Sequence, residues 1–353
     1  MRVLVIGGTG FIGTRLLRGL YAAGHEVTVY HRGVHEPPLP DGIRHVRSAL
    51  AVNPLVAFPD ELHALSFDVV VHMTLIGERD AEAVVEAFRD RAGRLVAASS
   101  GDVYAVHGQI LGLEASLAVP AAALTEDAPL RSVPYPYGRR APGPWGELVD
   151  YDKILVERIV LGEPALPATV LRLPAVYGPG DSQRRFLPWL KRMDDARPAI
   201  LIGAAEARWR FTHGYVENVA AALAVAVSDG RAAGRVYNVG EAPTPTVAER
   251  VAMVGRAAGW GGTVVVLPDD GLPAHLRAPY RIVADLAYDT TRIRRELGYA
   301  EPVAAVEGLG QTVTWERALG LTPRDPTLFD YGAEDRALAT AACSGEISGS
   351  THT

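Results

Sequence analysis

The residues best placed to do chemistry are three glycines at the start of the chain. Gly7, Gly10 and Gly13 follow the apolar residues 3–6, and residues 11–23, which include Gly13, have the apolar spacing of a helix. Gly7 allows a tight exit from a strand, Gly10 lets the backbone approach a phosphate, and Gly13 lets the next helix pack closely. The first N–H groups of that helix, at its positive dipole end, then face an anion. The pattern predicts a site for a dinucleotide pyrophosphate rather than a purely structural turn, formed by Gly7, Thr9, Gly10, Phe11, Ile12 and Gly13.

The end of the second expected strand, residues 26–30, indicates which cofactor is bound. A site for NAD is expected to place a carboxylate there, where it accepts hydrogen bonds from the ribose hydroxyls. The sequence instead continues with His31, Arg32 and Gly33. Arg32 could pair with the 2′-phosphate of NADP, and a solvated turn arginine is the alternative. We therefore expect NADP(H) to be favoured over NAD(H).

The composition of the 353-residue chain narrows the class of protein. Its 48% hydrophobic and 22% charged residues are ordinary for a soluble globular protein. The formal net charge of −6 argues against a nucleic-acid-binding surface, and no apolar run approaches the ~20 residues that span a bilayer. The only cysteine is Cys343, and His31 and His35 alone have the spacing of metal ligands. We expect a cytoplasmic protein that binds a small molecule and no metal, nucleic acid or membrane.

Strand and helix patterns alternate through the first half of the chain. Such alternation predicts right-handed βαβ units in a doubly wound parallel sheet, the Rossmann class of α/β fold. The expected strands are residues 2–6, 26–30, 45–47, 68–72, 94–98 and 168–173. The expected helices are residues 10–23, 79–90 and 147–162.

The second half predicts a smaller C-terminal α/β lobe that binds substrate. Before it, the proline-rich residues 113–146 lose periodicity, as expected for a loop that covers a site. The short elements expected beyond it are residues 186–193, 199–202, 217–227, 235–239, 247–258, 263–267 and 290–297. The expected domains are residues 1–175 with 213–240 returning to them, a substrate lobe of residues 176–212 and 241–322, and a partly disordered tail of residues 323–353. The ligand is expected between the lobes.

Six further segments follow the glycine-rich turn. They are Val69-Val-Val-His-Met-Thr74, Ser99-Ser-Gly-Asp-Val-Tyr104, Leu171-Arg-Leu-Pro-Ala-Val-Tyr-Gly-Pro-Gly180, Arg210-Phe-Thr-His-Gly-Tyr-Val-Glu-Asn-Val219, Val236-Tyr-Asn-Val-Gly240 and Glu296-Leu-Gly-Tyr299. In this order they resemble the extended short-chain dehydrogenase/reductase family, in its NAD(P)-dependent epimerase/dehydratase branch, across residues 1–320. The segment that begins at Arg210 departs from the family pattern by a one-residue insertion.

The resemblance implies roles that spacing alone does not assign. It implies that Ser100 polarises a substrate carbonyl and that Lys153 binds the nicotinamide ribose and lowers the pKa of a catalytic tyrosine. It places Tyr104 and Arg210 at the substrate, where Arg210 would bind a diphosphate unless it is a surface salt-bridge partner. The residues that it places around the cofactor are Met73, Thr74, Lys153, Pro174 and Val176.

The catalytic tyrosine of the family is missing from its expected position. It would lie four residues before Lys153, on the same face of a helix, and Val149 stands there. Tyr151 could replace it only if the helix starts late, and an ordinary packed aromatic is the alternative. Asp150 lies three residues before Lys153 and could supply a carboxylate, or be a salt-bridged residue at the helix start.

Two other positions could manage the proton. Tyr135 or Tyr137 could enter from the proline-rich loop, or simply pack within it. Asp102 lies two residues after Ser100, where the dehydratases of the family place a carboxylate that removes a proton beside a keto group. Its alternative is to cap the turn after residues 94–98. The expected catalytic residues are Ser100, Asp102, Tyr151 and Lys153.

The resemblance implies an oxidoreductase, epimerase or dehydratase that transfers hydride at nicotinamide C4, and Arg32 favours NADP(H) as its cofactor. Its substrate would be small and polar, such as a sugar nucleotide. A nucleotide-binding protein with little turnover and a simple NADPH-dependent carbonyl reductase are the alternatives. A homodimer is the family's usual assembly.

Overall fold

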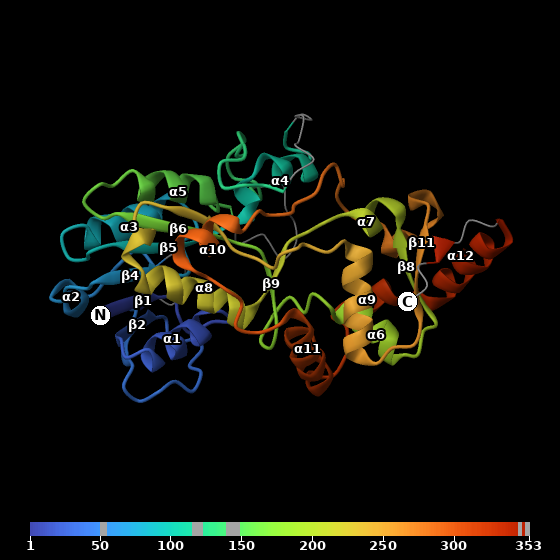
Figure 1. Ribbon diagram of the computed structural model, residues 1–353, viewed down its shortest axis with the longest axis horizontal. Helices are drawn as coiled ribbons and strands as arrows, with labels where there is room; N and C mark the ends of the chain where they lie inside the picture. Colours follow the sequence, from blue (N-terminus) through green and yellow to red (C-terminus); the bar gives the residue numbers. More distant parts are fainter. Residues whose placement is uncertain (50–54, 115–122, 139–148, 345–347, 350–353) are drawn as a thin grey trace.

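The computed structural model describes residues 1–49, 55–114, 123–138, 149–344 and 348–349. Its centre is a seven-stranded parallel sheet in the order β10-β6-β5-β4-β1-β2-β3 (Figure 1). The strands are β1 (Arg2–Ile6), β2 (Glu26–His31), β3 (Arg44–Arg47), β4 (Val69–His72), β5 (Leu95–Ser100), β6 (Ala168–Leu173) and β10 (Val236–Asn238). This confirms the expected Rossmann class of fold.

Alternate side chains of each central strand point to opposite faces, and helices cover both (Figure 1). In β1, Val3 and Val5 pack with α1 (Gly13–Ala22) and α8 (Val216–Ser228). Leu4 and Ile6 pack with α3 (Glu78–Phe88) and α5 (Lys153–Leu161) on the other face. The large sheet and its surroundings also include shorter helices. These are α2 (Asp60–His63), α4 (Ala105–Ile110), α10 (Thr291–Leu297) and the 3-10 helices η1 (Gly101–Val103) and η2 (Gly230–Ala232).

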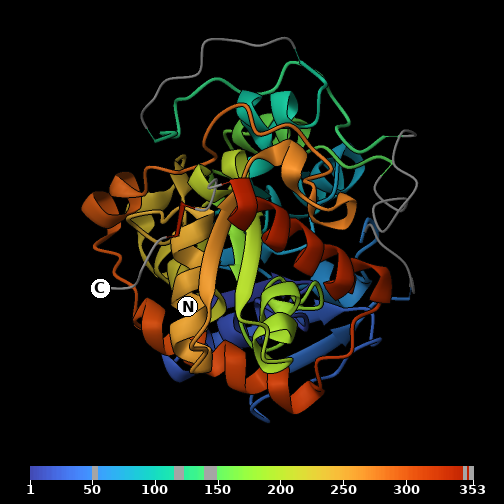
Figure 2. The same ribbon diagram turned by 90° about the vertical axis from the view of Figure 1, so that its right-hand side faces the viewer.

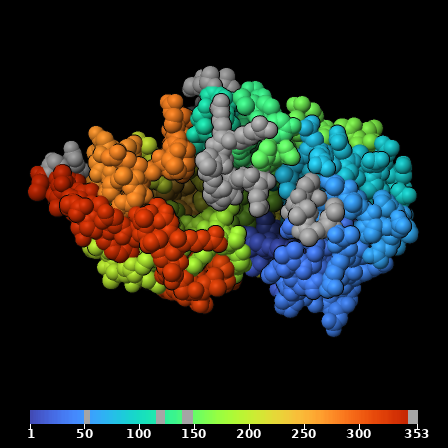
Figure 3. Space-filling model, turned by 180° about the vertical axis from the view of Figure 1, so that it is seen from behind, coloured from blue at the N-terminus to red at the C-terminus, as the bar shows by residue number. Residues whose placement is uncertain are grey.

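A second, smaller sheet forms the other end of the molecule (Figure 2). In it β11 (Thr263–Leu267) pairs in parallel with β8 (Ala199–Gly203) and antiparallel with β12 (Ser348–Gly349). Around it lie α6 (Leu187–Asp194), α7 (Ala204–Arg208), α9 (Val247–Ala258), α11 (Ala305–Leu319), α12 (Tyr331–Ser344), η3 (Asp269–Gly271), η4 (Ala274–Leu276) and η5 (Pro326–Phe329). Seen from behind, the N-terminal residues in blue and the C-terminal residues in red occupy opposite ends, and the surface is recessed between them (Figure 3).

The chain crosses between the two ends several times. The short parallel pair β7 (Ala175–Tyr177) and β9 (His213–Tyr215) lies between the sheets (Figure 1). From β9 the chain continues into α8 and then β10, which pairs with β6 at the edge of the large sheet.

Two elements differ from the sequence expectations. Residues 331–344, expected in a partly disordered tail, form α12, in which the buried Glu334 binds the buried Arg192 at 2.6 Å. The outer face of the small sheet accounts for this helix, because Ala341 packs on it with Leu201 and Val265. The helix expected over residues 147–162 begins at Lys153 in the described part of the chain, and residues 139–148 lie outside that part.

Candidate active site

The glycine-rich turn lies between β1 and α1, at the carboxyl edge of the large sheet. Gly7 has a φ of +77°, and a Cβ on it would lie 2.6 Å from Thr74 Cγ2. A Cβ on Gly13 would lie 2.5 Å from the carbonyl oxygen of Gly8, so α1 packs directly on the turn. A Cβ on Gly10, by contrast, would meet no described atom within 4 Å. The open side of the turn therefore faces outward from the start of α1, as a pyrophosphate site requires.

The other residues expected at the cofactor surround this turn. Phe11, Ile12, Met73 and Thr74 are half-buried, and Thr9 is buried. The hydroxyl of Thr74 is buried without a hydrogen-bond partner among the described residues, so it remains able to bind a polar group. Further along the same edge lie the half-buried Pro174, between β6 and β7, and Val176, in the core. These features fit a bound dinucleotide.

Among the described residues at the carboxyl end of β2, an exposed arginine follows a buried histidine. His31 is turned inward at 2% exposure, with its Nε2 3.1 Å from Nδ1 of His45. Burial, together with His45 and Arg47, lowers the pKa of His31. Arg32, the next residue, is exposed. Of these residues, Arg32 is the one placed to meet a ligand.

Four expected catalytic residues meet beyond the ends of β4 and β5. Ser100 Oγ accepts a hydrogen bond from the backbone N–H of Asp102 at 3.3 Å. The Tyr151 hydroxyl donates to Asp102 Oδ2 at 2.8 Å. The Nζ of Lys153 lies 5.6 Å from the centre of the Tyr151 ring. The structure thus places the hydroxyl, carboxylate, phenol and ammonium groups in one cluster, here called the Asp102 cluster.

Tyr151 reaches this cluster because it precedes the helix. Asp152 caps α5, its carboxylate accepting from the N–H of Ile154 at 2.9 Å, and the first helical residue is Lys153. The late start that Tyr151 requires is therefore present. Asp150 lies exposed in the preceding turn, so the expected role of a salt-bridged aspartate at the helix start belongs to Asp152 instead.

Lys153 is buried against the backbone. Its Nζ donates to the carbonyl oxygen of Leu75 and, at 3.0 Å, to that of Ala98. Burial lowers the pKa of Lys153, although Asp102, Asp80 and Glu157 partly oppose this. Glu157 lies four residues after Lys153. Its carboxylate forms an ion pair with Arg172 at 2.8 Å rather than with Lys153.

Burial, reinforced by Asp102, keeps the two neighbouring phenols protonated. Burial and Asp102 raise the pKa of Tyr151 well above its ordinary value, and they also raise the pKa of Tyr137. Both phenols are therefore protonated at neutral pH and donate to the carboxylate. Asp102 Oδ1 is buried with no partner among the described residues. That oxygen therefore keeps a free acceptor position within the cluster.

Sequence reasoning gave Tyr135 and Tyr137 equal standing, and the structure separates them. The Tyr137 hydroxyl lies 3.2 Å from Asp102 Oδ2 and 3.1 Å from Nε2 of His107. Tyr135 is exposed, and its hydroxyl donates to Glu78 at 2.6 Å. His107 was missed altogether, because no local pattern connects it to a tyrosine thirty residues further on.

The expectation that Tyr104 contacts substrate needs correction. Tyr104 is 0% exposed, and its hydroxyl donates to Asn238 at 2.6 Å and accepts from Arg172 at 3.1 Å. Burial raises the pKa of Tyr104. It therefore joins β5 to β6 and β10 inside the core rather than facing a ligand.

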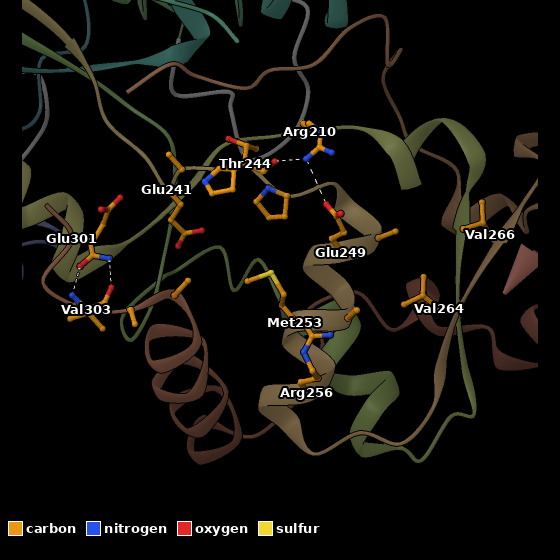
Figure 4. A pocket seen from close by; sticks show the side chains of 18 residues that line it. Arg210, Glu241, Thr244, Glu249, Met253, Arg256, Val264, Val266, Glu301 and Val303 are labelled. Atoms are coloured by element: carbon orange, nitrogen blue, oxygen red, sulfur yellow. Dashed lines mark hydrogen bonds and ion pairs between the residues drawn. The ribbon is translucent and has the colours of Figure 1, made fainter. Parts of the chain in front are cut away.

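Arg210, the other expected substrate residue, lines a cavity of about 1000 Å³ (Figure 4). Its guanidinium donates to the carbonyl oxygen of Thr244 at 2.6 Å and lies 3.6 Å from Glu249 on α9. The cavity extends from there along α9 past Met253 to Val303 before α11 (Figure 4). With its side chain 42% exposed and only a loose ion pair, Arg210 remains open to an anion.

Two kinds of feature are absent from the described part of the chain. There, no group of three or more His, Cys, Asp or Glu residues is arranged to hold a metal ion. Within the same residues, every helix is too short or too polar to cross a bilayer.

Comparisons with known proteins agree with this fold. A model of the NAD dependent epimerase/dehydratase family matches residues 3–240. The dTDP-glucose 4,6-dehydratase of Streptomyces niveus is 27% identical, over 90% of this chain and 93% of that protein. The 2'-dehydrokanamycin reductase of Streptomyces kanamyceticus is 30% identical, over 66% of this chain and 60% of that protein. The UDP-glucuronic acid 4-epimerase from Bacillus cereus, solved with UDP-glucuronic acid and NAD, superposes with a TM-score of 0.63 at 18% identity, covering 90% of this chain and 100% of that one.

Proposed function

Since the chain belongs to the NAD dependent epimerase/dehydratase family, we propose that it is an NAD(P)-dependent enzyme that epimerises, dehydrates or reduces a sugar nucleotide. The observation that carries this proposal is the Asp102 cluster beside an open glycine-rich turn. The dTDP-glucose 4,6-dehydratase and UDP-glucuronic acid 4-epimerase among the similar proteins support a sugar nucleotide as the substrate class.

Each residue of the Asp102 cluster has a separate role, which follows from its charge and its hydrogen bonds. A nicotinamide cofactor, when bound, supplies a hydride donor or acceptor. Ser100 and the Tyr151 hydroxyl hydrogen-bond the reacting oxygen, and Tyr151 gives or takes its proton. Asp102 accepts a proton on its unpartnered Oδ1. Lys153 holds the cofactor ribose, and its positive charge favours the ionised phenol during proton transfer.

We propose that NADP(H) is preferred over NAD(H). Arg32 supports this proposal because it is exposed after β2, where the sequence offers no adjacent carboxylate. A charge-assisted hydrogen bond contributes about 1.5–3 kcal/mol, so Arg32→Ala should weaken NADPH binding by roughly ten- to a hundredfold and leave NADH binding unchanged. Equal affinity of the wild type for the two cofactors would exclude this role.

A direct experiment on the activity uses dTDP-glucose and UDP-glucuronic acid as probes. The purified protein is mixed with each sugar nucleotide and with NADP or NADPH, and products are identified by mass spectrometry. A redox-neutral reaction leaves the cofactor absorbance unchanged, whereas simple reduction consumes NADPH in step with product. We expect Lys153→Met to lower turnover about a hundredfold. Wild-type and Lys153→Met proteins that behave identically in every assay would favour a protein with little turnover.

Arg210 is proposed to bind the diphosphate of the sugar nucleotide. Its open position in the large cavity supports this role. Arg210→Ala should then raise the KM for the sugar nucleotide about tenfold, the effect of losing one charged hydrogen bond, and leave kcat nearly unchanged. An unchanged KM would assign Arg210 to a surface contact with Glu249 instead.

A further inference from the structure

One buried cation connects the chain segment of Asp102 to the chain segment of Tyr151 and Lys153. The chemistry proposed above does not use it. Arg131 is 0% exposed at its side chain. Its Nε donates to the carbonyl oxygen of Asp102 at 2.9 Å, and its Nη2 donates to Asp152 Oδ1 at 3.1 Å. A third bond goes to the carbonyl oxygen of Val133. A single guanidinium thus connects the segment after β5 to the start of α5.

Asp152 spreads this connection over three chain segments. Its carboxylate accepts from the N–H of Ile154 in α5 at 2.9 Å and from the N–H of Tyr135 in the preceding loop at 2.8 Å. Its own N–H donates to the carbonyl oxygen of Ile76 at 2.9 Å. The side chain is 1% exposed. Each oxygen of Asp152 is therefore committed, and the position of α5 is fixed along its axis.

The place of Asp152 in the sequence gives these contacts a consequence for the site. Asp152 lies between Tyr151 and Lys153 in the sequence. The hydrogen bonds of Asp152 therefore determine the positions of both neighbours. A helix that continued back through Tyr151 would turn its side chain roughly 200° away from Lys153, at ~100° per residue. The cap stops the helix at Lys153, and Tyr151 instead meets Asp102.

Stability alone does not account for this arrangement. A buried ion pair is often no more stabilising than well-packed apolar side chains, because both charges lose their water. What an apolar pair would lack is the directed bond from Arg131 to the Asp102 carbonyl.

We propose that Arg131 and Asp152 are positioning residues that hold Tyr151 against Asp102. They thereby let a tyrosine two residues before Lys153 do the work of the one missing at position 149. The catalytic meaning of this inference rests on the proposed function, while the placement of the phenol does not.

The test replaces Arg131 and compares it with a matched buried pair. Arg131→Lys keeps the charge but loses the planar fork that reaches the three acceptors from three separate nitrogens. The control is Arg192→Lys, because Arg192 and Glu334 are also buried, at 3% and 1% exposure, and lie in the other lobe. We expect similar losses of Tm in both variants, and a fall in kcat of about a hundredfold in Arg131→Lys alone, as for a misplaced catalytic group. Equal kcat values in the two variants would overturn the proposal.

A second readout is independent of turnover. In protein labelled with fluorotyrosine, the Tyr151 fluorine resonance, identified with Tyr151→Phe, is followed against pH. Burial and Asp102 raise the pKa of Tyr151 in the wild type, with Tyr137 adding to the effect and Ser100 opposing it. We expect Arg131→Lys to lower that pKa towards the ordinary value, since the phenol leaves the carboxylate. An unchanged titration would overturn the proposal even in an active enzyme.

Asp152→Asn keeps the test decisive if Arg131→Lys does not fold. The amide retains an acceptor for Ile154 and loses the charge that pairs with Arg131. We expect the same downward shift in the pKa of Tyr151 as in Arg131→Lys. The wild type could lack turnover while Asp152→Asn still shows this shift in the pKa of Tyr151. That result would contradict the proposed function and support the positioning role. No shift in Asp152→Asn would contradict the positioning role itself.

Discussion

Asp102 is the residue on which the chemistry of this site converges. Two phenols, from Tyr137 and Tyr151, donate to its Oδ2 at 3.2 and 2.8 Å, and its Oδ1 is left without a partner among the described residues. A carboxylate held in this way can accept a proton at one oxygen while the phenols stabilise its charge at the other. These contacts support the proposed role of Asp102 as a proton acceptor over a turn cap alone.

Removing the Tyr151 hydroxyl should affect turnover and spare the fold. We expect Tyr151→Phe to lower kcat by about a hundredfold or more, the usual contribution of a general acid or base, with cofactor affinity unchanged. The measurement is steady-state kinetics beside a thermal melt. Tyr135→Phe is the matched control, because its hydroxyl binds the exposed Glu78 instead. Equal activities of the two variants would remove Tyr151 from the mechanism.

At the scale of the element, the start of α5 decides which tyrosine can act. The late start places Tyr151 in extended chain beside Asp102, whereas Val149 lies exposed at 45% in the turn before it. A tyrosine at position 149 has no helical turn to share with Lys153 in this structure. This is why we propose Tyr151, and not a residue at position 149, as the catalytic tyrosine.

A variant that moves the tyrosine tests this point. We expect the double variant Val149→Tyr, Tyr151→Phe to remain as inactive as Tyr151→Phe alone, since position 149 is 45% exposed whereas Asp102 is buried. Initial rates with the sugar nucleotide substrate provide the measurement. Recovery of even a tenth of wild-type kcat would mean that the helix extends further back in the working enzyme.

Many of the strands and helices could be predicted from the sequence, because local patterns of apolar and capping residues determine them. The apolar runs gave β1 and β6 with their exact bounds, and Thr246 with Glu249 forms the cap that starts α9 at Val247. Tyr137 and Tyr151 both contact Asp102, from 35 and 49 positions further along the chain. Hydrophobic periodicity carries no information about contacts over such separations. Helix α12 was missed for the same reason, since its packing against β11 is a long-range contact.

At the scale of the whole molecule, two buried histidines should make the fold sensitive to acid. Burial lowers the pKa values of His72 and His213 from 6.5 to about 3. Between these values the unfolded chain binds protons that the folded chain excludes, so stability falls as the pH falls from about 6.5. Each histidine should contribute up to about 1.4 kcal/mol per pH unit.

Urea unfolding at several pH values between 4 and 7 measures this slope. We expect His72→Asn and His213→Asn each to flatten the dependence of the unfolding free energy on pH, because the amide does not titrate. The exposed His35→Asn is the control and should leave the slope unchanged. Parallel curves for the wild type and both buried variants would show that other groups govern acid unfolding.

The most direct test of the whole account is calorimetric titration of Gly10→Ala with NADPH and NADH. A Cβ at this position meets no described atom within 4 Å, so the variant should fold with the wild-type Tm. If the N–H groups at the start of α1 bind the pyrophosphate, that Cβ occupies the space of a phosphate, and affinity should fall at least about tenfold, or 1.4 kcal/mol. Unchanged affinity in Gly10→Ala, or a wild type that binds neither cofactor, would contradict the account at its foundation.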